Sequence, residues 1–218
     1  MSKLEEAKKI FNAKKFSDAI PLFDEFLIEK PNHADALFFR AICYRKVEKY
    51  NDSVADFTAV INKLPDQADI YSERGVSYYH LKNYEAALQD LNKAVELEPE
   101  NPYRYSSRAY IRAYLDVDGA IADYEKTIEL DPKDEITYNN LGLLLENQGR
   151  IKKAQENFKK NNELSGYDPT KREPLPEVKK NTTEEENLTF WKVMKQLITS
   201  KKTQKEFSDF IKSGFKNK

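Results

Sequence analysis

Four prolines recur at an almost constant interval, and this interval constrains the fold more than any single residue does. Pro31, Pro65, Pro99 and Pro132 are separated by 34, 34 and 33 residues. A proline ends or breaks an α-helix because its ring clashes with the preceding turn and it lacks a backbone donor. A period of this length, with one helix end in each period, predicts a stack of two-helix hairpins.

Three further columns of residues follow the same period. A small residue recurs at Ala7, Ala41, Gly75, Ala109 and Gly142. A second small residue recurs at Ala19, Ser53, Ala87, Ala120 and Ala154, and a bulky one at Phe23, Phe57, Leu91, Tyr124 and Phe158. Small residues 11 or 12 positions apart allow two antiparallel helices to approach closely, and the bulky residue fills the space between successive hairpins. Within one period we expect helices at about 69–81 and 84–96.

The segment 68–101, ADIYSERGVSYYHLKNYEAALQDLNKAVELEPEN, resembles the tetratricopeptide repeat family almost throughout. The residues that carry the resemblance are Tyr71, Gly75, Tyr78, Tyr84, Ala87, Ala94 and Pro99. The resemblance covers residues 2–166 as five repeats, and it implies an all-α, right-handed solenoid of five helical hairpins. The fourth repeat is one residue short between Ala109 and Ala120, so we expect a tightened turn at 115–118, with Gly119 absorbing the strain.

The pattern divides the chain into three parts. Residues 1–165 are expected to form the five repeats, 166–182 a linker rich in proline, and 183–218 a two-helix C-terminal extension. Each helix of the extension begins with a capping-box pattern, Thr183 with Glu186 and Thr203 with Glu206. We expect the extension to fold back on the repeats, either as a cap on the fifth hairpin, which we favour, or in the concave groove.

Composition argues against a catalytic or metal site. The chain has 36 basic and 37 acidic residues, only 2 histidines and 6 glycines, and Cys43 as its single cysteine. These numbers exclude a disulfide within one chain, and they leave too few residues for a histidine metal cluster, a histidine-based triad or a glycine-rich phosphate loop. We therefore expect no enzyme activity and no cofactor. Without a secretion signal at the N-terminus or about 18 continuous apolar residues, a cytoplasmic location is the expectation.

The resemblance to the repeat family implies which side chains form a binding surface, because the first helix of each hairpin lines the concave face in that family. On this basis we predict a peptide-binding site. Its residues are Phe38, Phe39, Ile42, Arg45, Glu73, Val76, Tyr79, Tyr103, Ser107, Tyr110 and Asn140. Several of these aromatic residues have an alternative position, in which they pack between hairpins instead. An apolar strip with polar residues at its rim suits a peptide or an amphipathic helix.

We expect a protein-interaction scaffold that does not capture chaperone tails. Chaperone adaptors of the family hold a C-terminal carboxylate with lysine, asparagine and arginine, and no set of three consecutive repeats carries those residues here; Asp69 and Glu73 would repel the ligand. The alternative function is an adaptor anchored by its basic C-terminal helices to an anionic membrane or nucleic acid, although neither partner is favoured. Self-association through those helices is a further possibility.

Overall fold

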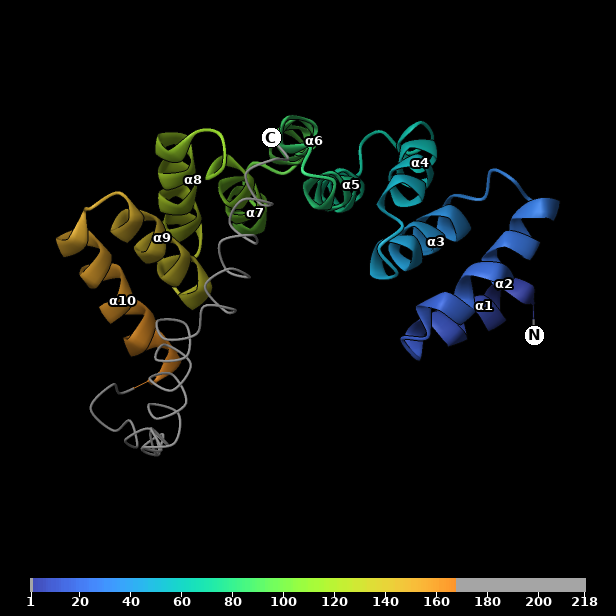
Figure 1. The fold of residues 1–218 in the computed structure, drawn as a ribbon, viewed down its shortest axis with the longest axis horizontal. Coiled ribbons are helices and arrows are strands. Elements are labelled where there is room, and N and C mark those ends of the chain that lie inside the picture. The colour runs from blue at the N-terminus through green and yellow to red at the C-terminus, as the bar shows by residue number, and fades with distance from the viewer. Residues whose placement is uncertain (1, 168–218) are drawn as a thin grey trace, which may run out of the picture. The chain divides into compact units, whose positions relative to one another are not determined.

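The structure, a computed structural model, describes residues 2–167, and these residues form ten α-helices (Figure 1). The first three hairpins are α1 (Lys3–Asn12) with α2 (Phe16–Glu29), α3 (Ala34–Lys46) with α4 (Tyr50–Ile61), and α5 (Ala68–His80) with α6 (Tyr84–Leu97). The last two are α7 (Pro102–Arg112) with α8 (Val117–Leu130), and α9 (Glu135–Asn147) with α10 (Ile151–Ser165). Five hairpins of helices, with no strand among the described residues, confirm the predicted solenoid class.

Each helix packs against the helices before and after it in the chain, and first helices also contact the next first helix in α1 and α3, α3 and α5, and α5 and α7. Figure 1 shows the hairpins in chain order from α1 to α10. This arrangement places the first helices side by side, so that their side chains share one face of the repeats. The second helices cover the opposite face.

The proline and core columns lie where the sequence predicts. Pro31, Pro99 and Pro132 each follow the end of a second helix by two residues, and Pro65 follows α4 by four. The paired small residues are buried, and Phe23 and Phe57 in the bulky column are fully buried. Gly142 has a specific packing reason, because a Cβ atom there would overlap the ring of Phe158.

The turn inside the fourth hairpin differs from the other four. Those four turns contain three residues, one of them left-handed: Lys14, Glu48, Lys82 or Gly149, with φ between 58° and 70°. The fourth turn connects Arg112 to Val117 without a left-handed residue.

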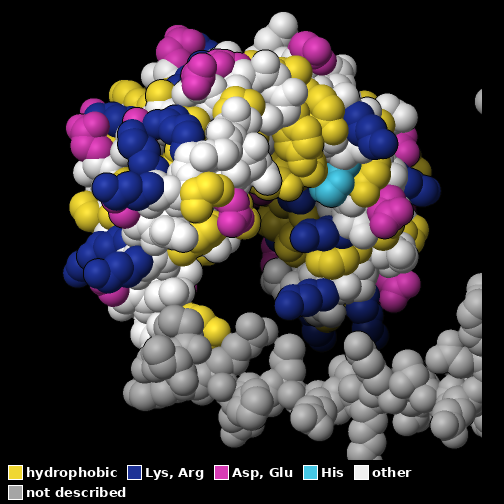
Figure 2. Space-filling model, turned by 60° about the vertical axis from the view of Figure 1, so that its left-hand side comes forward, with side chains coloured by type: hydrophobic (Ala, Val, Ile, Leu, Met, Phe, Trp, Pro, Cys, Tyr) yellow, Lys and Arg dark blue, Asp and Glu magenta, His cyan; other side chains and the backbone are white. Residues whose placement is uncertain are grey.

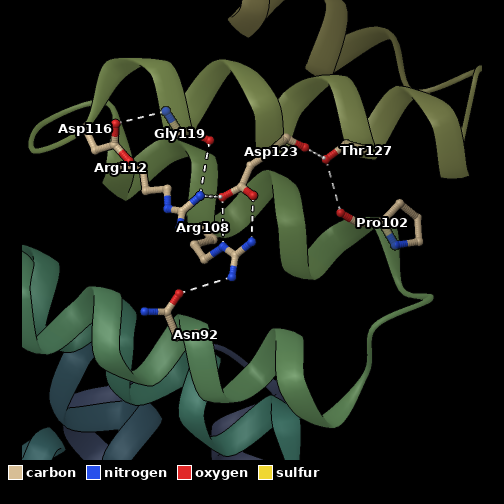
Figure 3. Close-up of polar contacts among 8 residues, drawn as sticks. All are labelled: Asn92, Pro102, Arg108, Arg112, Asp116, Gly119, Asp123 and Thr127. Carbon is tan, nitrogen blue, oxygen red and sulfur yellow. Dashed lines mark hydrogen bonds and ion pairs between the residues drawn. The ribbon is translucent and has the colours of Figure 1, made fainter.

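The carboxylate of Asp116 instead caps α8 by accepting a hydrogen bond from the Gly119 amide at 3.0 Å (Figure 3). The prediction that Gly119 absorbs backbone strain is wrong, because Gly119 lies inside α8 without a positive φ. A Cβ atom at this position would collide with the Asp116 carboxylate, so glycine leaves space for the helix cap.

A ladder of arginine–aspartate pairs joins the two helices of the second, third and fourth hairpins. Arg40 binds Asp56 through Nε and Nη2, both at 2.7 Å; Arg74 binds Asp90 at 2.8 and 2.6 Å, and Arg108 binds Asp123 at the same two distances. The third nitrogen of each arginine donates to the second helix of the preceding hairpin. Its acceptors there are Asp24, Thr58 and Asn92 in turn.

Figure 3 shows the last of these three units, in which the Arg108 side chain lies between Asn92 and Asp123. Two parallel hydrogen bonds to one carboxylate are the strongest form of this pairing. The ladder therefore fixes both the geometry within a hairpin and the contact with its predecessor.

The last helix of the described residues is α10, whose only buried residue is Ala154. Gly166 follows α10 in the left-handed conformation that commonly ends a helix. The predicted linker beyond Tyr167, the two helices of the extension, their cap or groove contact and the basic anchor all lie outside the described residues.

Candidate functional site

A cavity of about 380 Å³ opens on the face formed by α5, α7 and α9. Its apolar lining consists of Val76, Tyr79, Leu91, Tyr103, Tyr110, Ile111 and Ile136. Its polar lining consists of Ser72, His80, Ser106, Ser107, Asp134, Thr137 and Asn140. A mainly apolar cavity of this size with a few convergent polar groups is typical of a ligand site.

A second, smaller cavity adjoins the first, and the two share Tyr110 and Asn140. It lies toward the hairpin turns, where Tyr114, Leu143 and Leu144 contribute to its lining. The surface for a ligand is therefore continuous along α7 and α9. The space-filling view in Figure 2 shows hydrophobic side chains gathered beside a hollow in the surface, with charged side chains around them.

Exposed apolar side chains are concentrated at these two cavities. Ten large hydrophobic side chains are exposed among the described residues, and half of them line one cavity or both: Tyr103, Tyr110, Tyr114, Ile136 and Leu143. Exposed apolar residues scattered singly need no explanation, but a contiguous group marks an interaction surface. The group belongs to the fourth and fifth hairpins.

Three tyrosine hydroxyls connect α5 to α7 and the turn that follows it. The Tyr79 hydroxyl lies 3.0 Å from that of Tyr110 and 3.2 Å from that of Tyr114. These two hydrogen bonds raise the pKa of Tyr79 above its ordinary value. The Tyr114 ring also stacks on Tyr84 at 4.6 Å. The cluster fixes the part of the site that lies nearest the turn.

Buried Arg104 joins the same two helices, α5 and α7, at a second point beside the site. Its guanidinium donates to Ser72 at 3.0 Å, to Asp69 at 2.5 Å and to Glu98 at 2.9 Å. Burial by itself would lower the pKa of Arg104, but the hydrogen bonds to Glu98 and Asp69 outweigh it and raise the pKa. Because Ser72 lines the cavity, this contact sets the spacing between its two sides.

The structure brings together six of the eleven predicted site residues. These six line the larger cavity: Val76, Tyr79, Tyr103, Ser107, Tyr110 and Asn140. The other five come from the second hairpin or its contact with the third.

Among these five, Phe38 and Phe39 are half-buried, and their rings pack against Phe57 and Phe23 respectively. Ile42 packs against the same N-terminal core, and Arg45 is paired with Glu73. Packing between hairpins, the alternative position for the aromatic residues, therefore describes Phe39, whereas the Phe38 ring packs against the second helix of its own hairpin.

The predicted site omitted many residues that line the cavities, among them Tyr114, Asp134, Ile136 and Thr137. A periodic signal existed for the first of them. The His80 ring stacks on Tyr50 at 4.7 Å, and the Tyr114 ring stacks on Tyr84 in the same way. Tyr84 follows Tyr50 by 34 residues, and Tyr114 follows His80 by 34, so the second pair repeats the first one period later. The other three residues begin the fifth hairpin, where a repeat pattern fixes packing positions but not exposed ones.

Two features are absent from residues 2–167. This part of the chain has no cluster of three or more histidine, cysteine, aspartate or glutamate residues placed to hold a metal ion. It also has no helix with the length and apolar character that a membrane crossing needs.

Comparison with protein families identifies the repeats. Models described as tetratricopeptide repeat match residues 5–47, 68–101 and 136–165, and one described as TPR repeat matches residues 116–149. The chain belongs to the tetratricopeptide repeat family. A comparison with curated protein sequences gives no significant match.

Solved structures of the tetratricopeptide repeat family share the fold. A crystal structure of MamA is 24% identical with a TM-score of 0.68, and the match covers 73% of this chain and 94% of that one. Residues 41 to the end of MamA from Desulfovibrio magneticus RS-1 give 20% identity, a TM-score of 0.71 and coverages of 77% and 95%. YrrB, described as a TPR protein with an unusual peptide-binding site, is 19% identical with a TM-score of 0.63. That match covers 75% of this chain and 85% of YrrB.

Proposed function

We propose that this chain is a protein-interaction scaffold that binds a peptide segment or an amphipathic helix of another protein on α5, α7 and α9. The observation that carries the proposal is the concentration of exposed apolar side chains at two adjoining cavities. The same fold carries a peptide-binding site in YrrB, which supports this type of ligand.

The chemistry of the larger cavity suits a peptide. Aromatic and aliphatic walls from Tyr79, Tyr110 and Ile136 can bury an apolar side chain, and the hydroxyl of Ser107 and the amide of Asn140 can pair with backbone groups of the ligand. No lysine or arginine lines the cavity. A ligand held mainly by its terminal carboxylate is therefore not the type of partner that we propose.

Replacement of two exposed cavity residues tests the proposal with little risk to the fold. Tyr103 and Ile136 are 60% and 66% exposed, so Tyr103→Ser with Ile136→Ser removes ligand contacts without opening a buried cavity. Partner proteins are captured with the full chain, identified by mass spectrometry, and their affinities measured. We expect the double variant to bind a direct partner at least about tenfold more weakly, because a buried large side chain contributes roughly 1.5–3 kcal/mol.

The matched control is Ile28→Ser with Leu64→Ser. Both residues are exposed, at 80% and 42%, and neither lines the two cavities. Binding by this variant should equal that of the unaltered chain. If both double variants bind the captured partner equally well, this face is not the interaction site.

A further inference from the structure

The arginines beside the proposed site are already paired with carboxylates of the same chain. On α5, Arg74 is paired with Asp90, and on α7 buried Arg104 is paired with both Asp69 and Glu98. Arg108 and Arg112, also on α7, share Asp123 on the side that faces α8 (Figure 3). These guanidinium groups are committed to the fold, so they are poorly placed to receive an anionic ligand.

Asp134 differs from these paired carboxylates. It lines the larger cavity as the N-cap of α9, where it accepts hydrogen bonds from the Thr137 amide at 3.2 Å and the Thr137 hydroxyl at 2.6 Å. Among the described residues it has no ion-pair partner. A carboxylate has about four acceptor positions, so the two bonds from Thr137 leave room for a donor of a ligand. Asp134 carries the only carboxylate in the cavity lining, and His80 the only imidazole.

The wider surroundings add to the negative character of this face. Asp69 is 77% exposed, and it shares its single guanidinium partner, Arg104, with Glu98. The tyrosine rings contribute in the same direction, because the face of an aromatic ring is negative and attracts cations. Tyr79 and Tyr110 present such rings in the cavity lining, whereas the Tyr103 ring already has the Arg104 guanidinium 5.6 Å from its centroid.

We infer that the partner segment bound at this site is cationic: a lysine or arginine of the ligand pairs with Asp134, beside an apolar residue held by Tyr79, Tyr110 and Ile136. The inference rests on the proposed function and names its ligand class. A long basic side chain fits both environments, since its methylene groups pack on tyrosine while its charged end reaches the carboxylate. An acidic segment would lose its hydration without gaining a cation.

The test uses the full chain and a displayed library of random dodecapeptides. We expect selected peptides to combine lysine or arginine with aromatic or aliphatic residues. The best of them is then synthesised with its basic residue intact and with that residue replaced by glutamine or glutamate. Binding by fluorescence anisotropy should weaken about two- to tenfold with glutamine, and further with glutamate, because a partly exposed ion pair contributes modestly.

The decisive variant is Asp134→Asn, because asparagine preserves the helix cap but removes the charge. It should lower the affinity for the basic peptide about two- to tenfold and leave the affinity for the glutamine peptide unchanged. Asp116→Asn is the matched control: Asp116 caps α8 through the same bond to the third following amide, lies outside both cavities, and should change neither affinity. Circular dichroism checks that both variants melt like the unaltered chain.

The possible results separate the two proposals. Selected peptides whose binding does not depend on Tyr103 and Ile136 would contradict the proposed function itself. Peptides that depend on these two residues but show no preference for lysine or arginine, or no response to Asp134→Asn, would overturn the cationic-ligand inference and leave the proposed function standing.

Discussion

Two buried side chains link the stability of the repeats to alkaline pH. Burial raises the pKa of the Cys43 thiol from 9.0 to about 12 and that of the Tyr124 hydroxyl from 10.0 to about 12. Both groups are neutral in the folded state, whereas an unfolded chain ionises them at their ordinary values. Their contribution to folding is therefore complete below pH 9 and is lost as the pH rises toward 12.

We expect the melting temperature to fall between pH 9 and 11 more steeply than in a Cys43→Ala, Tyr124→Phe variant, which lacks both ionising groups. Thermal melts by circular dichroism at half-unit pH intervals measure this difference. Cys43 is the only cysteine and is fully buried, so its reaction with a thiol reagent at pH 8 should require unfolding. If the melting temperatures of the unaltered chain and the variant fall equally with pH, these two side chains do not cause the alkaline loss of stability.

The limits of sequence reasoning are clear from individual residues. The positions of Phe23 and Phe57 follow from the period, because every hairpin must fill the same space. Phe38 and Phe39 are adjacent on α3, and their rings reach different hairpins, Phe57 on α4 and Phe23 on α2. Which neighbour an aromatic ring meets depends on helix orientation, and the repeat pattern does not fix that orientation.

At the scale of the element, the arginine–aspartate ladder holds each of three hairpins together. Burial raises the pKa of Asp56 and Asp90, although their arginine partners oppose the shift. Burial therefore disfavours the charged form of each carboxylate, and the hydrogen bonds from its arginine offset part of that cost. The residues at 40, 74 and 108, with those at 56, 90 and 123, form a periodic column of charges in the sequence, but the period alone does not show that they pair.

We expect Asp90→Ala to lower the free energy of unfolding by about 3–5 kcal/mol, because it leaves the half-buried guanidinium of Arg74 without its carboxylate. Replacing both partners, in Arg74→Met with Asp90→Leu, should cost much less. Urea denaturation followed by circular dichroism measures both effects.

Lys93→Ala is the control for loss of a charge, since it breaks only an exposed pair with Glu96 and should cost less than about 1 kcal/mol. Equal losses for Asp90→Ala and Lys93→Ala would show that the ladder contributes no more than a surface ion pair.

At the scale of the whole molecule, each repeat is stabilised by its contacts with neighbouring repeats. The fifth hairpin lacks the arginine–aspartate pair and has few buried residues on its second helix. The arginine column ends at Arg108, since Leu141 occupies the next equivalent position. Only Ala154 is buried on α10. In an array stabilised by nearest-neighbour contacts, a unit with weaker contacts opens at lower free energy.

We therefore expect backbone amides of α9 and α10 to exchange with deuterium faster than those of α5 and α6. Hydrogen exchange followed by mass spectrometry on the full chain measures the difference. Amides of α3 and α4, which have ladder contacts on both sides, provide the internal reference and should resemble α5 and α6. Equal protection of α10 and α6 would contradict the prediction.

The ladder also bears on how such a chain can lengthen. Each arginine finds its carboxylate 15 or 16 residues later and its other acceptor 16 residues earlier, and that acceptor is an aspartate, a threonine or an asparagine. Since the earlier position accepts three different side chains, a duplicated hairpin inserted after Asn101 would still supply every bond. Insertion of whole hairpins thus preserves the arginine hydrogen bonds between neighbouring hairpins, and each added hairpin brings new surface for binding.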